Sequence, residues 1–236
     1  MSSIRTILVT GANQGLGMHT VHQLAASLNV LVFMGSRKLA AAQEALATFA
    51  ASIHPSSQVV PVQLDITDPV SVKNAHTSIA DCLREKNLPG LDVLINNAGR
   101  GGAIEEAYAV NVFGTVAMTE AMRPLLNNGS AILNISSRLG SLASYTKRPP
   151  TRIINPAYSS SKVALNSLTL QWAIQEEQKG SGIRVVSICP GYNATNLTKY
   201  SGGMRPAQGC KIIVREALAK EGRSGVYFDK DGDIEW

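Results

Sequence analysis

The sequence has 236 residues, of which 44% are hydrophobic and 17% are charged, and it contains no low-complexity run. A chain of this size can bury one sizeable core, and α/β chains of this length often form one domain. The net charge of +5 does not indicate a nucleic-acid partner, because the basic residues are dispersed and no aromatic residues are interleaved with them. No apolar run is long enough to span a bilayer, and we expect neither a membrane segment nor a signal peptide.

The cysteines and histidines do not indicate a metal site. Cys82, Cys189 and Cys210 are an odd and scattered set, which is typical of ordinary thiols in a reducing compartment. His19 and His22 are three residues apart, but no further ligand completes a metal-binding set around them. We therefore expect a cytoplasmic protein without a bound metal ion.

Apolar, strand-like runs alternate with helical patterns along the whole chain. The strand-like runs cover residues 4–10, 30–36, 58–64, 92–96, 130–136, 183–189 and, more weakly, 225–228. The helical patterns cover residues 15–28, 38–52, 69–87, 104–127, 157–179 and 206–221. This alternation predicts an α/β fold with a doubly wound sheet of about seven parallel strands and helices on both faces. No linker and no internal repeat interrupts it, so we expect residues 1–236 to form a single domain.

A glycine-rich turn follows the first predicted strand and opens the first helix. Its residues are Gly11, Ala12, Asn13, Gln14, Gly15, Leu16 and Gly17, after Thr10. Glycines at this place allow backbone N–H groups to approach a pyrophosphate at the positive end of the helix. Glycine also marks any tight strand-to-helix turn, so the alternative is a purely structural turn. The position directly after the first strand favours cofactor binding.

The end of the second predicted strand distinguishes between the two nicotinamide dinucleotides. An acidic residue here would hold a ribose 2′-hydroxyl, whereas a 2′-phosphate needs hydrogen-bond donors and positive charge. The sequence has Ser36 and Arg37 at this place and no Asp or Glu. This favours NADP(H) over NAD(H). The alternative is that Arg37 and Lys38 only begin a solvated helix.

The ends of the third and fourth predicted strands carry further polar residues. Asp65, followed by Ile66, could accept a hydrogen bond from an adenine amine, or it could simply be another acidic residue at a helix start. Residues 96–99, which include Asn97, Ala98 and Gly99, suit a backbone turn beside a flat ring. We assign these residues to the cofactor site together with the glycine turn.

Tyr158 and Lys162 lie four residues apart in a helical pattern, so both side chains are on the same helix face. A free tyrosine has a pKa near ~10, and a positive charge held close to the hydroxyl favours the phenolate and lowers that pKa. Such a pair is chemically suited to general acid–base catalysis. The alternative is a surface tyrosine and a solvated lysine that share a helix face by chance.

Taken together, these motifs resemble the short-chain dehydrogenases/reductases over nearly the whole chain. The motifs that carry the resemblance are the glycine turn, Asp65, residues 96–99, Asn111, Ser137, the Tyr158/Lys162 pair and residues 189–195. The final residues, 225–236, are similar to the carbonyl-reductase-like branch. The resemblance implies a Rossmann-type, single NAD(P)-binding domain that transfers a hydride between NADPH and a ketone, aldehyde or quinone.

The resemblance also implies roles for individual residues. Tyr158 would be the general acid or base, and Lys162 would bind the nicotinamide ribose and lower the pKa of Tyr158. Ser137 would hydrogen-bond the substrate oxygen, with Ser136 as the alternative if the register is shifted by one residue. Asn111 would support a water relay to Lys162. The residues implied at the nicotinamide end of the cofactor are Pro190, Gly191, Asn193 and Thr195.

Departures from the family pattern bear on the substrate. The segment from Asn97 to Asn111 is short, and the segment from Ser137 to Tyr158 contains a basic, proline-containing insertion over residues 145–152. The insertion either contributes to specificity or is a surface excursion without substrate contact. Residues 192–206 form a short substrate lid, in which Gly202 and Gly203 suggest mobility. Gln14 replaces a basic residue that often supports NADP, so Arg37 alone carries the prediction of a 2′-phosphate contact.

The substrate and the oligomeric state are not determined by these patterns. A mixed apolar and aromatic wall is expected from Tyr145, Ile153, Ile154, Tyr192 and Leu197. The alternatives to a reductase are an epimerase or dehydratase of the same fold and a non-catalytic NADP-binding sensor. Both a monomer and a homo-oligomer remain open.

Overall fold

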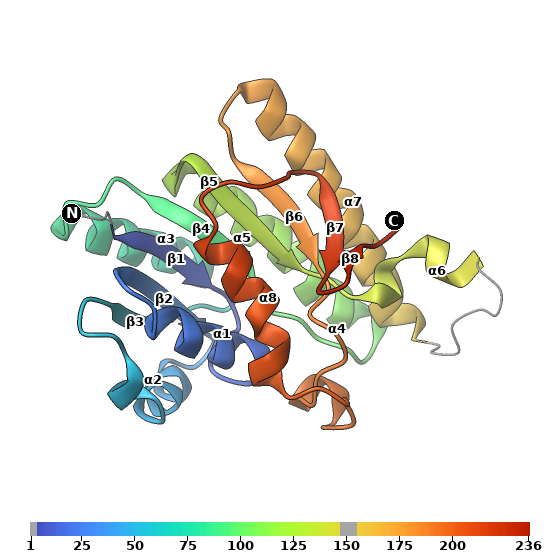
Figure 1. Cartoon of the computed structure of the whole chain (residues 1–236), viewed down its shortest axis with the longest axis horizontal. Helices are drawn as coiled ribbons and strands as arrows, with labels where there is room; N and C mark the ends of the chain where they lie inside the picture. The colour runs from blue at the N-terminus through green and yellow to red at the C-terminus, as the bar shows by residue number, and fades with distance from the viewer. Residues whose placement is uncertain (1–3, 147–154) are drawn as a thin grey trace.

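An eight-stranded sheet forms the centre of the protein, whose computed structural model describes residues 4–146 and 155–236 (Figure 1). The strand order is β3-β2-β1-β4-β5-β6-β7-β8. The strands are β1 (Arg5–Val9), β2 (Val30–Ser36), β3 (Gln58–Gln63), β4 (Leu91–Asn96), β5 (Leu126–Ile135), β6 (Arg184–Ile188), β7 (Val226–Asp229) and β8 (Gly232–Asp233). The first seven pair in parallel, which confirms the predicted doubly wound, Rossmann-type sheet. The two-residue β8, antiparallel to β7, is too short for a sequence pattern to reveal.

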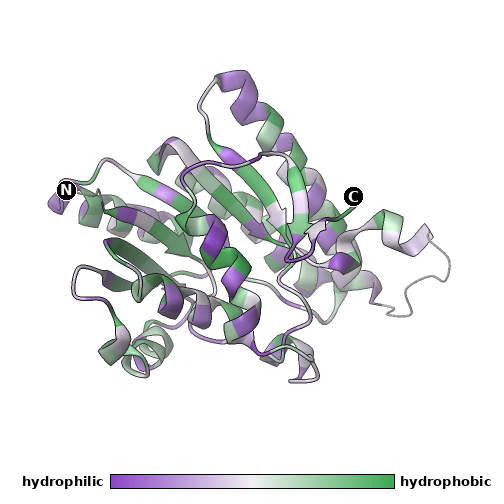
Figure 2. Cartoon of the chain, in the orientation of Figure 1, coloured by the Kyte–Doolittle hydropathy of each residue, from purple (hydrophilic) through white to green (hydrophobic). Residues whose placement is uncertain are grey.

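Helices cover both faces of the sheet, and each face has its own apolar core. The front face in Figure 1 is covered by α1 (Gly15–Ala25), α2 (Leu39–Ala47) and α8 (Pro206–Leu218). The other face is covered by α3 (Pro69–Glu85), α5 (Thr115–Met122) and α7 (Pro156–Lys179). Because Ile7 and Val9 enter one core while Leu8 enters the other, β1 is apolar at consecutive positions. Figure 2 shows these apolar strands between amphipathic helices.

The predicted helix over residues 104–127 is wrong in its middle and at its end. The structure has α4 (Ile104–Tyr108), a π-helical stretch (Ala109–Gly114), α5 and a 3-10 turn (Arg123–Leu125). Pro124 lies in that 3-10 turn, where its missing N–H cannot continue an α-helix. Leu126 then pairs with Leu91, so β5 begins four residues earlier than the apolar run 130–136 indicates.

Three 3-10 turns and the short helix α6 complete the described part of the chain. A 3-10 turn (Ala50–Ser52) follows α2, a second (Arg138–Gly140) follows β5 and precedes α6 (Leu142–Thr146), and a third (Asn196–Thr198) lies between β6 and α8. Across residues 4–146 and 155–236, no helix combines the length and apolar character that a membrane crossing requires.

The start and end of α7 follow from local sequence signals. Asn155 caps the helix by accepting a hydrogen bond from the Tyr158 backbone N–H (3.2 Å), and Pro156 occupies the first turn. Gly180 ends the helix in the left-handed conformation, with φ of 63°. This cap fixes where the first turn of α7, which carries Tyr158, begins.

Candidate active site

The glycine turn and residues 96–99 meet at the carboxyl edge of the sheet, where the strand order reverses between β1 and β4. The Thr10 hydroxyl accepts hydrogen bonds from the backbone N–H groups of Asn97 and Ala98, both at 3.0 Å. The Asn97 side-chain amide donates to the carbonyls of Thr10 (2.9 Å) and Gly11 (3.0 Å). Ligands of doubly wound folds bind at this switch point. Asn97 therefore fixes the glycine turn, a role that Thr10 shares and that the motif alone does not reveal.

The backbone conformation explains why three positions in the turn are glycine. Gly11 and Gly15 have φ of 60° and 55°, which side chains rarely adopt. A Cβ atom at Gly17 would lie 2.5 Å from the Asn97 amide nitrogen and 2.5 Å from the Gly11 carbonyl. The Gln14 side chain makes no capping bond at the start of α1. The open N-terminus of α1 and the compact turn before it fit a pyrophosphate group.

Ser36, Arg37 and Asp65 lie at the ends of the neighbouring strands. Ser36 is buried, and its hydroxyl donates to the Lys38 carbonyl (3.0 Å). Arg37 is exposed and has no ion pair within the described residues. Asp65 accepts from the Thr67 N–H and hydroxyl through Oδ1 (2.9 and 2.7 Å), while Asp68 caps α3. Asp65 is thus not the cap of α3. Ile66, the residue that follows it, is buried.

Tyr158, Lys162 and Ser137 come together at the same edge. Lys162 is 3% exposed, its Nζ donates to the Ile135 carbonyl (2.8 Å), and Nζ lies 5.6 Å from the centroid of the Tyr158 ring. The Tyr158 hydroxyl and the Ser137 side chain are hydrogen-bonded. The Ser136 hydroxyl instead donates to Asn166 Oδ1 (2.7 Å). Of the two serines considered from the sequence, the structure therefore places Ser137 beside Tyr158.

The environment shifts the pKa values of the tyrosine and the lysine in opposite directions. Burial raises the pKa of Tyr158, the nearby Cys189 adds to this effect, and the hydrogen bond with Ser137 opposes it. Burial lowers the pKa of Lys162 to about 8, which Cys189 opposes. The expected lowering of the Tyr158 pKa by Lys162 is therefore wrong for this structure, because the cost of desolvating the phenolate dominates. The ammonium also lies over the ring and is hydrogen-bonded to Ile135.

Asn111 is fully buried in the π-helical stretch and faces α7. Its Oδ1 accepts from the Arg100 N–H, and its amide donates to the Arg100 carbonyl, both at 2.8 Å. The amide also donates to the Ser161 hydroxyl (2.9 Å). A Cβ atom at Gly99 would lie 3.5 Å from Asn111 Oδ1 and 3.7 Å from Lys162 Nζ. The short segment 97–111 thus brings Asn111 Oδ1 and Lys162 Nζ close to the same point beside Gly99.

The segment after β6 lies against the glycine turn. A Cβ atom at Gly15 would be 3.3 Å from Thr195 Cγ2, and the Asn196 amide donates to Gln14 Oε1 (2.6 Å). The Asn193 side chain is buried, and its amide donates to the carbonyls of Pro190 (3.0 Å) and Gly191 (2.9 Å). Asn193 therefore stabilises the Pro190–Gly191 turn through its side-chain amide.

Gly202 lies where two chain segments approach each other closely. A Cβ atom there would collide with the backbone of Asn193, so glycine permits a close approach of two chain segments. Backbone hydrogen bonds from Ala194 to Met204 (2.8 Å) and from Met204 to Tyr192 (3.1 Å) fasten the same region. Gly203, by contrast, has open space where a Cβ atom would lie.

Two of the expected wall residues have defined surroundings. The Tyr145 hydroxyl is 2.9 Å from Ser159 Oγ, which places it against the first turn of α7. Tyr192 is 56% exposed, and its hydroxyl bonds Ser201. Leu197 is also exposed. Ile153, Ile154 and residues 147–152 of the insertion lie outside the described residues.

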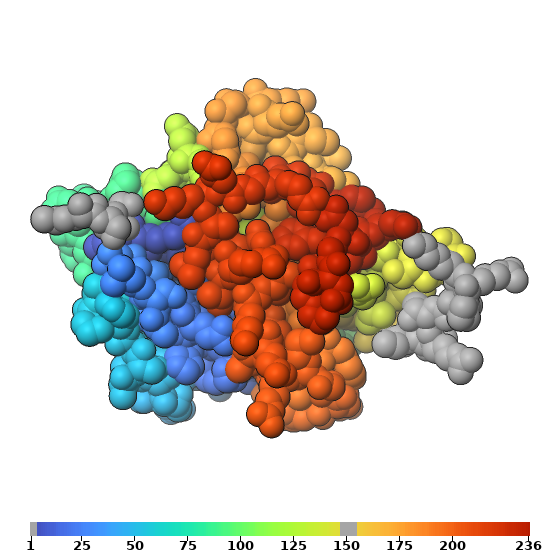
Figure 3. Space-filling model, in the orientation of Figure 1, coloured from blue at the N-terminus to red at the C-terminus, as the bar shows by residue number. Residues whose placement is uncertain are grey.

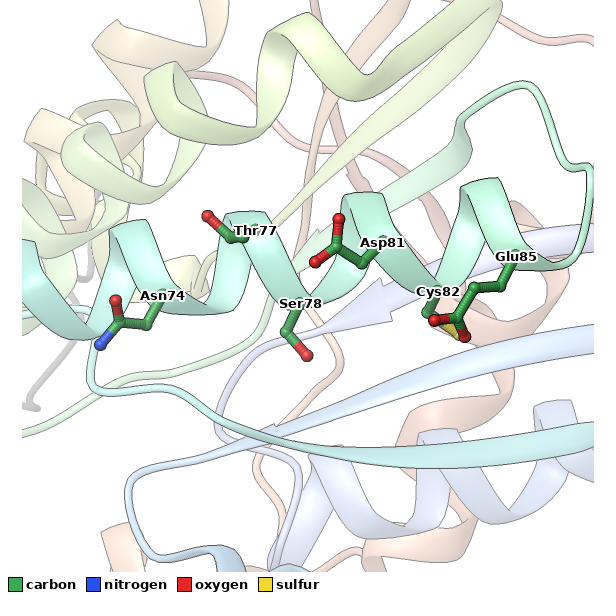
Figure 4. Close-up of a pocket in the computed structure, with 6 residues that line it drawn as sticks. All are labelled: Asn74, Thr77, Ser78, Asp81, Cys82 and Glu85. Carbon is green, nitrogen blue, oxygen red and sulfur yellow. The ribbon is translucent and has the colours of Figure 1, made fainter.

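A separate surface depression of about 500 Å³ lies along α3 (Figure 4). Its lining residues all come from that one helix: Asn74, Thr77, Ser78, Asp81, Cys82 and Glu85. It is not formed by the strand ends and contains none of the predicted site residues. Within the described part of the chain, no three His, Cys, Asp or Glu residues are grouped to hold a metal ion.

A doubly wound sheet with a glycine turn at its switch point is the architecture of dinucleotide-binding proteins. Residues 5–205 match the family model described as short chain dehydrogenase, and the chain belongs to this family of oxidoreductases. It is 32% identical to the short-chain dehydrogenase anuI of Penicillium roqueforti, with 97% of this chain and 94% of the relative covered. It is 28% identical to (+)-neomenthol dehydrogenase of Arabidopsis thaliana, with 96% of each covered.

The solved structures include a similar reductase. The NADPH-bound carbonyl reductase from chicken fatty liver superposes with a TM-score of 0.80 at 28% identity, with 100% of both chains covered. This likeness supports the carbonyl-reductase-like branch indicated by the C-terminal residues.

Proposed function

We propose that the protein is an NADPH-dependent carbonyl reductase in which residues 1–236 form one cofactor-binding domain. The observation that carries this proposal is the meeting of Tyr158, Lys162 and Ser137 beside the glycine turn. Carbonyl reduction needs a proton donor and a hydrogen-bond donor for the carbonyl oxygen beside a bound cofactor. Two hydroxyls and a buried ammonium next to a dinucleotide-binding turn provide these groups. The similarity to an NADPH-bound carbonyl reductase supports the same assignment.

The proposed reaction divides the work between the cofactor and the protein. When bound, NADPH would supply the hydride for the carbonyl carbon, and the products would be an alcohol and NADP⁺. Tyr158 donates its proton to the oxygen on which negative charge develops, and Ser137 donates a hydrogen bond to the same oxygen. Donors aimed at developing charge act selectively on the transition state. The raised pKa of Tyr158 keeps its proton available at neutral pH.

The remaining residues are proposed to hold the cofactor and the ammonium. The Lys162 ammonium is proposed to bind the nicotinamide ribose, and Asn111 positions the backbone around it. The turn 11–17 is proposed at the pyrophosphate, and Asp65 and Asn97 at the adenosine half of the cofactor. Ala98 and Gly99 continue the turn that Asn97 begins. Pro190, Gly191 and Thr195 are proposed at the nicotinamide end, where Asn193 acts through the turn that it stabilises.

The proposed activity is tested by NADPH oxidation with a panel of aldehydes, ketones and quinones. We expect one NADPH to be oxidised for each alcohol formed with at least one compound class. Binding of NADPH without turnover across a broad panel would contradict the reductase and would favour a sensor. Conversion of a substrate without net NADPH consumption would favour an epimerase or dehydratase.

Arg37→Ala tests the proposed preference for NADPH. Arg37 is exposed at the end of β2 and has no ion pair within the described residues, so its guanidinium is free for a 2′-phosphate. Charge-assisted hydrogen bonds contribute ~1.5–3 kcal/mol, so we expect KM for NADPH to rise by roughly 10- to 100-fold. The KM for NADH should stay unchanged, and Lys73→Met on the exposed face of α3 is the control for loss of a surface charge. An equal effect on both cofactors would exclude the 2′-phosphate contact.

A further inference from the structure

The segment that carries Ser137 is held on one side by α7. The Asn166 amide donates to the Gly140 carbonyl (3.0 Å), and a Cβ atom at Gly140 would lie 2.9 Å from the Lys162 carbonyl carbon. The segment therefore packs directly on the helix that also carries Tyr158. This contact fixes Gly140 on the helix, but it leaves the Ser137 end of the segment to be fixed by other contacts.

The contact at the Ser137 end comes from β7. The Tyr227 hydroxyl donates a hydrogen bond to the Ser137 backbone carbonyl, although the two residues are 90 positions apart in the sequence. Tyr227 is 1% exposed, and its ring packs on Trp236 with 5.3 Å between centroids. Burial on all sides leaves the ring little freedom, so the hydroxyl is a fixed donor.

The C-terminal residues fasten the rest of the segment in the same way. Arg138 Nε donates to Asp229 Oδ2 (2.8 Å) in an ion pair with β7. The Ser141 hydroxyl donates to the Glu235 carbonyl (2.6 Å), and the Ala143 N–H donates to the Trp236 carbonyl (3.0 Å). Figures 1 and 3 show the C-terminal residues, in red, beside the yellow segment that contains α6.

We infer that Tyr227 is a positioning residue that sets the orientation of Ser137 toward the substrate oxygen. The inference rests on the proposed function, because it concerns the geometry of Ser137 in the same reaction. Ser137 directly precedes the 3-10 turn Arg138–Gly140, and its hydroxyl also accepts from the Leu139 N–H (3.2 Å). A hydrogen bond to the Ser137 carbonyl fixes the peptide plane that follows its Cα, and with it the direction of the side chain. The hydrogen bond from Tyr227 reaches Ser137 at this backbone atom and not at its hydroxyl.

Tyr227→Phe removes the hydroxyl and keeps the ring against Trp236. A misplacement of about 1 Å at a reacting group costs up to ~10²-fold in rate, so we expect kcat to fall by roughly 10- to 100-fold. The KM for NADPH should not change, because the proposed cofactor contacts lie elsewhere. The matched control is Thr6→Val, at the opposite end of the sheet. It removes a buried hydroxyl that donates to the Gly90 carbonyl (2.7 Å), and we expect it to lower Tm without lowering kcat.

A double-variant experiment separates positioning from general loss of stability. In a Ser137→Ala background, Tyr227→Phe should cause no further fall in kcat, because the residue that it positions is already absent. Full additivity of the two effects would overturn the inference, and so would a Tyr227→Phe variant with the kcat of the wild type. A fall in kcat of the same size in Thr6→Val would also overturn it.

Amide hydrogen exchange tests the contact without any substrate. Residues 137–143 should exchange faster in Tyr227→Phe than in the wild type or in Thr6→Val. Unchanged exchange in this segment would overturn the inference even if no carbonyl substrate is known. A wild-type protein that reduces no carbonyl compound, but whose 137–143 segment exchanges faster in Tyr227→Phe, would contradict the reductase proposal and leave the Tyr227 contact established.

Discussion

Tyr158→Phe is expected to lower kcat for carbonyl reduction by about 10²- to 10⁴-fold, the range of a positioned general acid. The Tyr158 hydroxyl lies beside the Ser137 side chain at the carboxyl edge of the sheet. The Tyr227 hydroxyl instead bonds the Ser137 backbone carbonyl. Phenylalanine keeps the ring that lies over Lys162. The Kd for NADPH should therefore stay close to that of the wild type, as measured by fluorescence titration.

Tyr108→Phe is the matched control for Tyr158→Phe. Tyr108 is a partly buried tyrosine whose ring contacts Phe113, and it has no proposed role at the site. We expect this variant to keep wild-type turnover and cofactor affinity. If Tyr158→Phe instead retained turnover close to that of the wild type, the proton would have to come from another group.

Lys162→Met is expected to abolish most turnover without unfolding the protein. Loss of hydrogen bonds from a charged group costs ~1.5–3 kcal/mol, which corresponds to roughly 10- to 100-fold weaker NADPH binding. Methionine fills most of the space of the lysine stem and avoids the burial of an ammonium. Because burial lowers the pKa of Lys162 to about 8, the protonated side chain opposes folding at neutral pH. We therefore expect a Tm for the variant equal to or above that of the wild type at pH 7.

The lowered pKa of Lys162 also predicts how the stability and the activity of the protein depend on pH. Between pH 8 and the ordinary lysine value of 10.5, the unfolded chain binds more protons at Lys162 than the folded protein does. The Lys162 contribution to the free energy of unfolding therefore becomes more favourable as pH rises through this window, and Lys162→Met lacks this change. The catalytic rate should change in the opposite direction to the stability as pH rises. The rate of reduction should fall above about pH 8 as the ammonium loses its proton, while Tyr158 stays protonated because its own pKa is raised.

Lys73→Met is the control for these measurements, since Lys73 is exposed on α3. Its pH–rate profile should match that of the wild type. A wild-type rate that stays constant from pH 7 to pH 10 would exclude a role for the protonated Lys162 in the rate-limiting step.

The sheet could be predicted because its determinants are local. Consecutive apolar residues such as 7–9 mark a strand that is buried on both faces, and the glycine turn identifies the edge at which the site forms. The spacing of Tyr158 and Lys162 places both on one face of α7. The middle of the predicted helix 104–127 could not be foreseen, because the bonds that Asn111 makes to Arg100 and Ser161 depend on tertiary contacts.

Other features of the site depend on contacts between distant residues. The sequence motif alone does not distinguish Ser136 from Ser137. In the structure, Ser136 bonds Asn166, whereas Ser137 lies beside Tyr158. The direction of the Tyr158 pKa shift depends on a balance of burial and charge that spacing alone does not give. The need for glycine at position 202 comes from the backbone of Asn193, nine residues earlier, which the local sequence does not reveal.

The central claim is that the edge formed by Ser137, Tyr158 and Lys162 transfers a hydride from NADPH to a carbonyl carbon. The most direct test is a single turnover with NADPH deuterated at both C4 positions of the nicotinamide, followed by mass spectrometry of the product. We predict an alcohol that carries one deuterium on the former carbonyl carbon, formed by the wild type and by Tyr108→Phe and much more slowly by Tyr158→Phe. A product without deuterium at that carbon would contradict the account.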